Sequence, residues 1–147
     1  MVDATAGAIT GAVHVLPIRV YYEDTDASGI VYYANYLRFI ERARTDFLRL
    51  AGVSHSRLWD EDGLAFTVRS CALEYLAPAR LDDQVEVHTR LTGVGGATLD
   101  AEQIVRRDGA ELMRSRIRIA CVNRHGRPAR LPRPIRAALE RFAPPQG

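Results

Sequence analysis

Residues 18–36 read IRVYYEDTDASGIVYYANY, and this stretch decides the fold because a strand, a turn and the start of a helix follow one another within it. From Pro17 to Glu23 the chain alternates with period two and includes β-branched and aromatic residues, which is typical of a strand. Residues 24–29 are Asp, Thr, Asp, Ala, Ser and Gly, a composition that favours a turn. We therefore expect a strand that ends in a loop rich in carboxylates.

A long helix is predicted directly after this loop. Apolar residues recur near helical spacing from Tyr36 to Ala51. Asn35 is in position to cap the first turn, and Gly52 marks the end. The polar positions of the helix carry charges of both signs, which favours a solvent-exposed face. They are Arg38, Glu41, Arg42, Arg44, Asp46 and Arg49.

Strands are predicted for most of the remaining chain, over residues 64–75, 84–91, 97–107 and 111–122. Asp108-Gly109 supplies a hairpin turn between the last two, because glycine tolerates the positive φ that such a turn needs. From Met113 to Cys121 apolar residues alternate with arginines, so one sheet face is apolar and the other is wet or at an interface. A short helix is predicted after the prolines, around residues 135–142.

The length of 147 residues fits one domain, and the composition is that of an ordinary globular protein. Residues 1–15 are rich in Ala, Gly and Thr and are predicted to be a flexible tail, which leaves residues 16–142 as a single domain. One strand, one long helix and four antiparallel strands indicate an α+β fold. We expect the helix to lie across one face of a five-stranded sheet.

Several functional classes are excluded by composition. All 20 basic residues are arginine, and without lysine there is no Walker-type phosphate site, pyridoxal-phosphate Schiff base or Ser-Lys dyad. A net charge of +2 is too small to predict nucleic-acid binding. No apolar run is long enough for an integral membrane segment and no basic leader opens the chain, so we expect a cytoplasmic location. Cys71 and Cys121 are predicted to be buried thiols.

The two carboxylates of the loop, Asp24 and Asp26, allow three interpretations. They can cap backbone amides of the turn, bind a divalent cation, or carry out acid-base or nucleophilic chemistry. The adjoining helix start offers unpaired N–H groups that stabilise an oxyanion. No cluster of Asp, Glu or His with ligand spacing lies nearby in the sequence, so no metal is expected. The residues alone do not decide between capping and catalysis.

These residues resemble those of the hot-dog acyl-CoA thioesterases, in particular the Tol-Pal-associated, YbgC-like branch and the related 4-hydroxybenzoyl-CoA thioesterases. The motifs that carry the resemblance are VYYEDTD at residues 20–26, Gly29, VY at 31–32, NY at 35–36, ERAR at 41–44 and PARLDD at 78–83. It covers residues 17–140. The resemblance implies a hot-dog fold, in which an antiparallel five-stranded sheet wraps around one long central helix.

The resemblance also assigns roles to residues. Asp26 corresponds to the catalytic carboxylate, the N–H of Tyr33 to the donor that holds the thioester carbonyl, and Asp24 to a structural acid. Gly29 and Val31 fall in the substrate-binding loop. The stretch that holds the nucleotide end of CoA corresponds to residues 95–98, where this chain lacks the basic residues of the family. The expected phosphate contacts here are Thr98 and either Arg90 or Arg106.

The implied reaction is hydrolysis of a short-chain or aromatic acyl-CoA to the free acid and CoA, without cofactor or metal. Whether Asp26 attacks the carbonyl itself or activates a water molecule is left open by the sequence. The expected partners are acyl-CoA, an acyl carrier protein as a second carrier of the same thioester, and further copies of the chain in a homodimer or homotetramer. The alternative is a non-catalytic module that binds an acyl thioester or acyl carrier protein.

Overall fold

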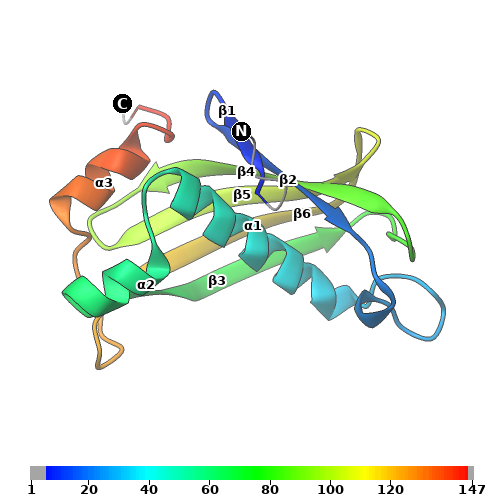
Figure 1. Cartoon of the computed structure of the whole chain (residues 1–147), viewed down its shortest axis with the longest axis horizontal. Coiled ribbons are helices and arrows are strands. Elements are labelled where there is room, and N and C mark those ends of the chain that lie inside the picture. The colour runs from blue at the N-terminus through cyan, green and yellow to red at the C-terminus, as the bar shows by residue number, and fades with distance from the viewer. Residues whose placement is uncertain (1–5, 146–147) are drawn as a thin grey trace.

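The computed structural model describes residues 6–145, which form one antiparallel sheet, a long helix across it and short flanking helices (Figure 1). The strands are ordered β1-β2-β4-β5-β6-β3. Their bounds are β1 Ala8–Thr10, β2 Val13–Arg19, β3 Ala65–Tyr75, β4 Gln84–Val94, β5 Thr98–Arg107 and β6 Ala110–Val122. The helices are α1 Tyr36–Leu50, α2 His55–Arg57 and α3 Arg133–Glu140. The predicted α+β arrangement of one long helix against a curved antiparallel sheet is confirmed.

The sheet has six strands, so the prediction of five is wrong by one. The additional strand, β1, pairs with β2 inside the range that was expected to be a flexible tail. His14, also in that range, is fully buried, and its Nε2 lies 2.7 Å from Oδ2 of Asp46. The Gly7 N–H donates to the same oxygen at 2.8 Å. Long-range contacts therefore hold this segment against α1, whereas residues 1–5 lie outside the described part of the chain.

The apolar face of α1 packs against β2 and β4 and supplies much of the core. Phe39, Ile40, Ala43 and Phe47 are at most 1% exposed. The prediction that the polar face is wholly solvated is wrong for Asp46, which is buried beside His14. Partial burial also lowers the pKa of Arg44, whose Nη1 donates to Oε1 of Gln103 at 2.9 Å.

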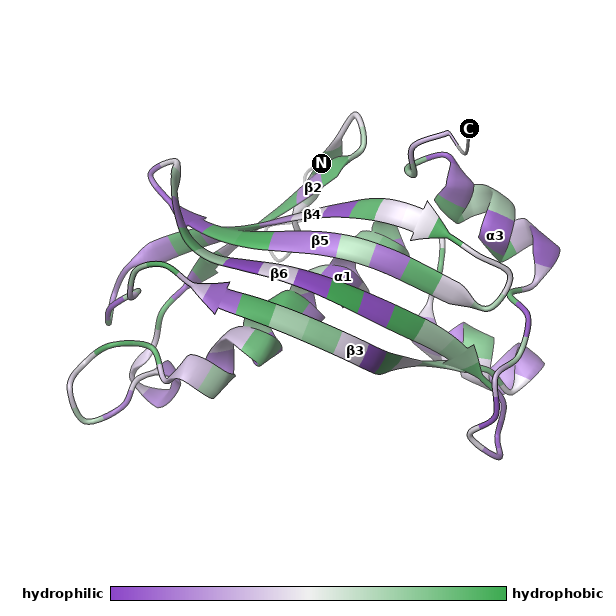
Figure 2. Ribbon diagram, turned by 180° about the vertical axis from the view of Figure 1, so that it is seen from behind, coloured by the Kyte–Doolittle hydropathy of each residue, from purple (hydrophilic) through white to green (hydrophobic). Residues whose placement is uncertain are grey.

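The opposite face of the sheet carries no helix, and its strands alternate between hydrophilic and hydrophobic residues (Figure 2). As predicted, the odd-numbered positions of β6 from Met113 to Cys121 are buried, and the intervening arginines are exposed. The predicted hairpin turn is confirmed, since Asp108 and Gly109 have φ values of 50° and 82°.

Strand β3 forms an open edge, because it pairs only with β6. Helix α1 does not cover it, so Val68 and Tyr75 stay 48% and 47% exposed. Cys71 is exposed for the same reason, and the prediction that both thiols are buried is correct only for Cys121. The open edge thus combines unpaired backbone with exposed apolar side chains.

The end of the chain agrees with the prediction of a short helix. Helix α3 packs against β4, and Leu139 is fully buried. Within residues 6–145, no helix has both the length and the apolar composition needed to cross a membrane.

Candidate active site

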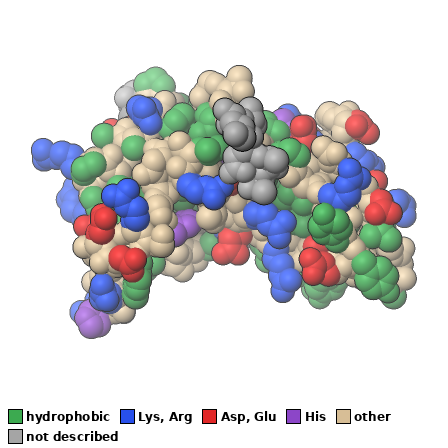
Figure 3. All heavy atoms as spheres, viewed as in Figure 1, with side chains coloured by type: hydrophobic (Ala, Val, Ile, Leu, Met, Phe, Trp, Pro, Cys, Tyr) green, Lys and Arg blue, Asp and Glu red, His purple; other side chains and the backbone are tan. Residues whose placement is uncertain are grey.

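The loop between β2 and α1 holds Asp26 in a tight turn. The Asp26 N–H donates to the Ile30 carbonyl at 2.9 Å, and the Gly29 N–H donates to the Asp26 carbonyl at 3.1 Å. Gly29 has a φ of +80°, a conformation that a residue without Cβ adopts without strain. Apolar and acidic side chains are exposed together at the end of the molecule that this loop forms (Figure 3).

The Asp26 carboxylate is exposed, and only one of its oxygens is engaged. Oδ1 accepts from the Ser28 hydroxyl at 2.5 Å and from the Ser28 N–H at 2.8 Å. Oδ2 accepts no hydrogen bond from residues 6–145. The Ser28 hydroxyl, followed by the Ser28 N–H, lowers the pKa of Asp26 below its usual value. The carboxylate is therefore ionised at neutral pH, with one oxygen available to react.

Asp24 has a different environment, in which both oxygens are used by the protein. Oδ2 accepts from the Tyr21 N–H at 2.9 Å, and Oδ1 accepts from Nδ2 of Asn35 at 2.8 Å. The Asp24 carbonyl accepts the Tyr32 N–H at 2.9 Å. Asn35 was expected to cap its own helix, but its side chain bonds to Asp24 instead. Asp24 thus ties the start of the loop to the start of α1.

Tyr33 lies at the first position of a 3₁₀ turn, Tyr33–Asn35, that leads into α1. The Tyr32 carbonyl accepts the Asn35 N–H at 2.8 Å, which holds the plane of the Tyr32–Tyr33 peptide. No acceptor for the Tyr33 N–H lies within hydrogen-bonding reach in the described chain. An unpaired amide at a helix start is a donor for an anionic oxygen.

The segment that follows β3 supports this loop from behind. The Val31 N–H donates to the Ala79 carbonyl at 2.8 Å, and the Leu81 N–H donates to the Gly29 carbonyl at 3.1 Å. The Ala79 N–H in turn donates to the hydroxyl of Tyr36 at 3.1 Å. Val31 is 3% exposed, so its side chain supports the loop from the core.

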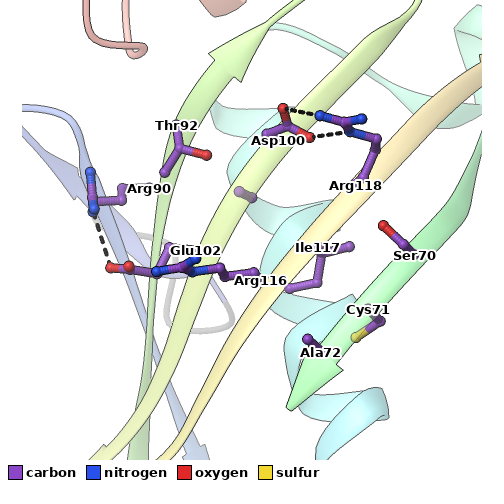
Figure 4. Close-up of a pocket in the computed structure, with 11 residues that line it drawn as sticks. Ser70, Cys71, Ala72, Arg90, Thr92, Asp100, Glu102, Arg116, Ile117 and Arg118 are labelled. Carbon is purple, nitrogen blue, oxygen red and sulfur yellow. Dashed lines mark hydrogen bonds and ion pairs between the residues drawn. The ribbon is translucent and has the colours of Figure 1, made fainter. Parts of the chain in front are cut away.

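Thr98, one of the predicted nucleotide-binding residues, lies far from Asp26 within one chain. Arg106 instead pairs with Glu86 near the start of β4, toward the Asp26 side of the sheet. Thr98 opens β5 beside the last residues of β4, whereas the first residues of β4 adjoin the Asp26 side of the sheet. Strand β4 has 11 residues and is thus roughly 35 Å long. Arg90 lies on the helix-free face, with its Nε 3.1 Å from Oε1 of Glu102 (Figure 4). That face is hollowed there by about 530 Å³.

A family model described as the thioesterase-like superfamily matches residues 20–139. The chain belongs to this superfamily. It is 43% identical over 124 residues to "Acyl-CoA thioesterase YbgC" from Haemophilus influenzae, covering 84% of this chain and 91% of that protein. It is 45% identical over 108 residues to "Acyl-CoA thioester hydrolase YbgC" from Escherichia coli, covering 73% of this chain and 80% of that protein.

Solved structures confirm the hot-dog fold. A hypothetical protein from Thermus thermophilus superimposes with a TM-score of 0.81 at 36% identity, covering 87% of this chain and 95% of that chain. A 4-hydroxybenzoyl CoA thioesterase mutant complexed with 4-hydroxybenzoyl CoA has a TM-score of 0.81 at 20% identity, covering 87% of this chain and 99% of that chain. At that identity the second comparison shows the fold alone.

Two residues beside the predicted site residues, Arg130 and Tyr75, were not predicted from the sequence. A Cβ built on Gly96 would lie 3.7 Å from Nη2 of Arg130, so a guanidinium adjoins the predicted nucleotide stretch. The hydroxyl of Tyr75 donates to the Tyr33 carbonyl at 2.9 Å. Neither residue belongs to a motif that marks it, because each meets its partner only in the folded chain. Among residues 6–145 no three His, Cys, Asp or Glu side chains come close enough to hold a metal ion.

Proposed function

We propose that this chain hydrolyses short-chain or aromatic acyl-CoA thioesters, with Asp26 as the reacting carboxylate and the Tyr33 N–H as the oxyanion donor. Its class as an acyl-CoA thioester hydrolase follows from membership of the superfamily and from the two YbgC relatives above 40% identity. One observation carries the mechanism. A carboxylate with a free oxygen and a backbone amide without an acceptor lie on the same strand-to-helix junction.

In this mechanism the thioester carbonyl oxygen accepts a hydrogen bond from Tyr33, which stabilises the negative charge that develops there. Asp26 then follows one of two routes. Its Oδ2 attacks the carbonyl carbon, expels the CoA thiolate and leaves an acyl-aspartyl anhydride that water hydrolyses. Alternatively, Asp26 removes a proton from water, whose oxygen attacks the same carbon. Both routes give the free acid and CoA.

Aromatic rings beside the junction support the proposed acyl preference. The Tyr33 ring lies 4.8 Å from that of Tyr32 and 6.4 Å from that of Tyr75, between ring centroids. All three rings are exposed, so they form a surface that an aromatic or short acyl group can contact.

We propose that two copies join edge to edge through β3. A two-fold axis perpendicular to the sheet runs the two β3 strands antiparallel, which places the Ala65 end of one copy beside the Tyr75 end of the other. A cavity of about 220 Å³ near the Ala65 end would then face the tyrosines. Its walls include Glu41, Arg44, His55, Phe66 and Val68.

The same pairing explains how the remote nucleotide contacts would be used. The end of the sheet that carries Thr98 and Arg130 in one copy turns toward the Asp26 end of the other. The two residues would then bind CoA phosphates. Arg130 would supply the guanidinium that residues 95–98 themselves lack. Arg90 is already paired with Glu102 and is the weaker contact. We also propose that two such dimers pair into a tetramer. A cytoplasmic location is part of the same proposal.

Two measurements test the proposal. Light scattering at assay concentration should give at least twice the monomer mass of 16.4 kDa, and a monomer would contradict the edge-to-edge dimer. Release of CoA thiol should be measured on acetyl, butyryl, palmitoyl and benzoyl CoA, and then on an acyl carrier protein charged with the best acyl group. The butyryl or benzoyl substrate should be turned over fastest. Tight binding of all substrates without turnover would instead favour a non-catalytic binding module.

A further inference from the structure

Tyr75 connects the edge strand β3 to the start of α1. It is the last residue of β3, and its hydroxyl donates to the carbonyl oxygen of Tyr33 at 2.9 Å. The two residues are 42 positions apart in the chain, so the contact exists only in the folded protein. Partial burial raises the pKa of Tyr75 above its ordinary value, which already lies well above neutral pH, so the hydroxyl carries its proton and can donate.

The surrounding structure aims this hydroxyl. The Tyr75 ring packs edge-on against Tyr36, with centroids 5.6 Å apart, and Tyr36 is buried and bonded to the Ala79 N–H. Directly after Tyr75, the N–H groups of Leu76 and Ala77 both donate to the Leu112 carbonyl, at 2.8 Å and 3.2 Å. The ring is thus held on one side by a core residue and on the other by a fixed backbone.

The acceptor matters because of its place in the turn. The Tyr33 carbonyl belongs to the peptide that also carries the Ala34 N–H, and a peptide unit is planar. A hydrogen bond to that carbonyl therefore orients the Ala34 amide. The preceding peptide, which carries the Tyr33 N–H, is held by the bond from Asn35 to the Tyr32 carbonyl at 2.8 Å. Successive amides at the helix start are thus held by two separate bonds.

We propose that Tyr75 is a positioning residue for the oxyanion site, holding the Tyr33–Ala34 peptide so that the amides of the turn face the reacting carbonyl. The inference rests on the proposed function. A helix start has no preceding turn to hold its peptides, and its first residues fray readily. A side chain from a neighbouring strand supplies the missing restraint without touching the substrate carbonyl itself.

Tyr75→Phe tests this role, because it removes the hydroxyl and keeps the ring. Deleting a direct oxyanion donor lowers kcat by about 10²- to 10³-fold. Loss of a bond that only positions such a donor should cost less, roughly 5- to 30-fold in kcat, with KM unchanged within about twofold. Tyr22→Phe is the matched control, since Tyr22 is 82% exposed and its hydroxyl bonds to no described residue. The control should retain full turnover.

A pair of inert CoA analogues separates positioning from general damage. A trifluoromethyl ketone analogue forms a tetrahedral adduct whose oxygen needs the oxyanion site, whereas a thioether analogue has no carbonyl. Tyr75→Phe should weaken binding of the ketone by about the same factor as kcat/KM and leave the thioether unaffected. Equal losses for both analogues, or a kcat within twofold of wild type, would overturn the role of Tyr75 alone. A wild-type protein that hydrolyses no acyl-CoA would overturn the proposed function as well.

Discussion

Asp26→Asn is the substitution that most directly tests the proposed chemistry. Asparagine is nearly isosteric, and its Oδ1 can still accept both bonds from Ser28, which lie at 2.5 Å and 2.8 Å in the wild type. The loop should therefore fold normally. What is lost is the negative charge on the free oxygen, which serves as nucleophile or base. General-base effects alone span about 10² to 10⁴, so kcat should fall by roughly a hundredfold or more. This corresponds to at least about 2.7 kcal/mol in the activation barrier.

The assay is steady-state release of CoA thiol, accompanied by binding of a non-hydrolysable thioether analogue and by thermal unfolding. Asp26→Asn should keep the affinity and the melting temperature of the wild type. Asp24→Asn should behave in the opposite way, because its new NH₂ group must face either the Tyr21 N–H or Nδ2 of Asn35, both of which are donors, unless the Asn35 amide flips out of its present orientation. It should destabilise the fold by about 1–3 kcal/mol and affect the chemical step less. Near-native turnover by Asp26→Asn would refute the mechanism.

Single contacts elsewhere in the chain support three more predictions. Ser28→Ala removes the hydroxyl that holds the pKa of Asp26 down. Because the ionised form is the active one, the acidic loss of kcat/KM should move to higher pH, and an unchanged pH profile would argue against Asp26 as the reacting group. Asp46→Asn should lower the free energy of unfolding by about 2 kcal/mol in urea at pH 7, since it disrupts the bonds from His14 and Arg49 at 2.7 Å and 2.6 Å. The Asp46 pKa is lowered because these bonds and the Gly7 N–H outweigh desolvation, so the stabilisation is present above the unfolded-state pKa and disappears as pH falls through the lower folded-state pKa. A difference between the two proteins that persists undiminished below that pH would contradict this account. Arg130→Ala should weaken CoA binding more at 50 mM than at 500 mM salt by calorimetry, because an exposed phosphate contact is screened by ions.

The sequence by itself determined the parts of this protein that are local. The loop and the helix are readable because they lie within one continuous stretch, where turn composition gives way to apolar spacing of 3.6 residues. The role of Asp26 in this loop stays a prediction. The hairpin at Asp108-Gly109 is equally local, since the turn depends on the φ values of two adjacent residues. The alternation in β6 correctly predicted which side chains are buried and that the intervening arginines are exposed, because alternation is also a local pattern.

Only the tertiary structure decided which surfaces are covered and which distant groups meet. Periodicity shows that a strand has an apolar face, but it does not show whether a helix reaches over it, so it did not predict that Cys71 is exposed. It also did not show that the N-terminal segment packs on α1 and buries Asp46. The N-terminal segment carries too weak a pattern to predict a strand and is held by bonds to Asp46, 32 and 39 positions away. The bond from Tyr75 to Tyr33 likewise joins residues whose separation in the chain hides their relation. Such contacts depend on the packing of the whole sheet against α1, and no local pattern of residues encodes them.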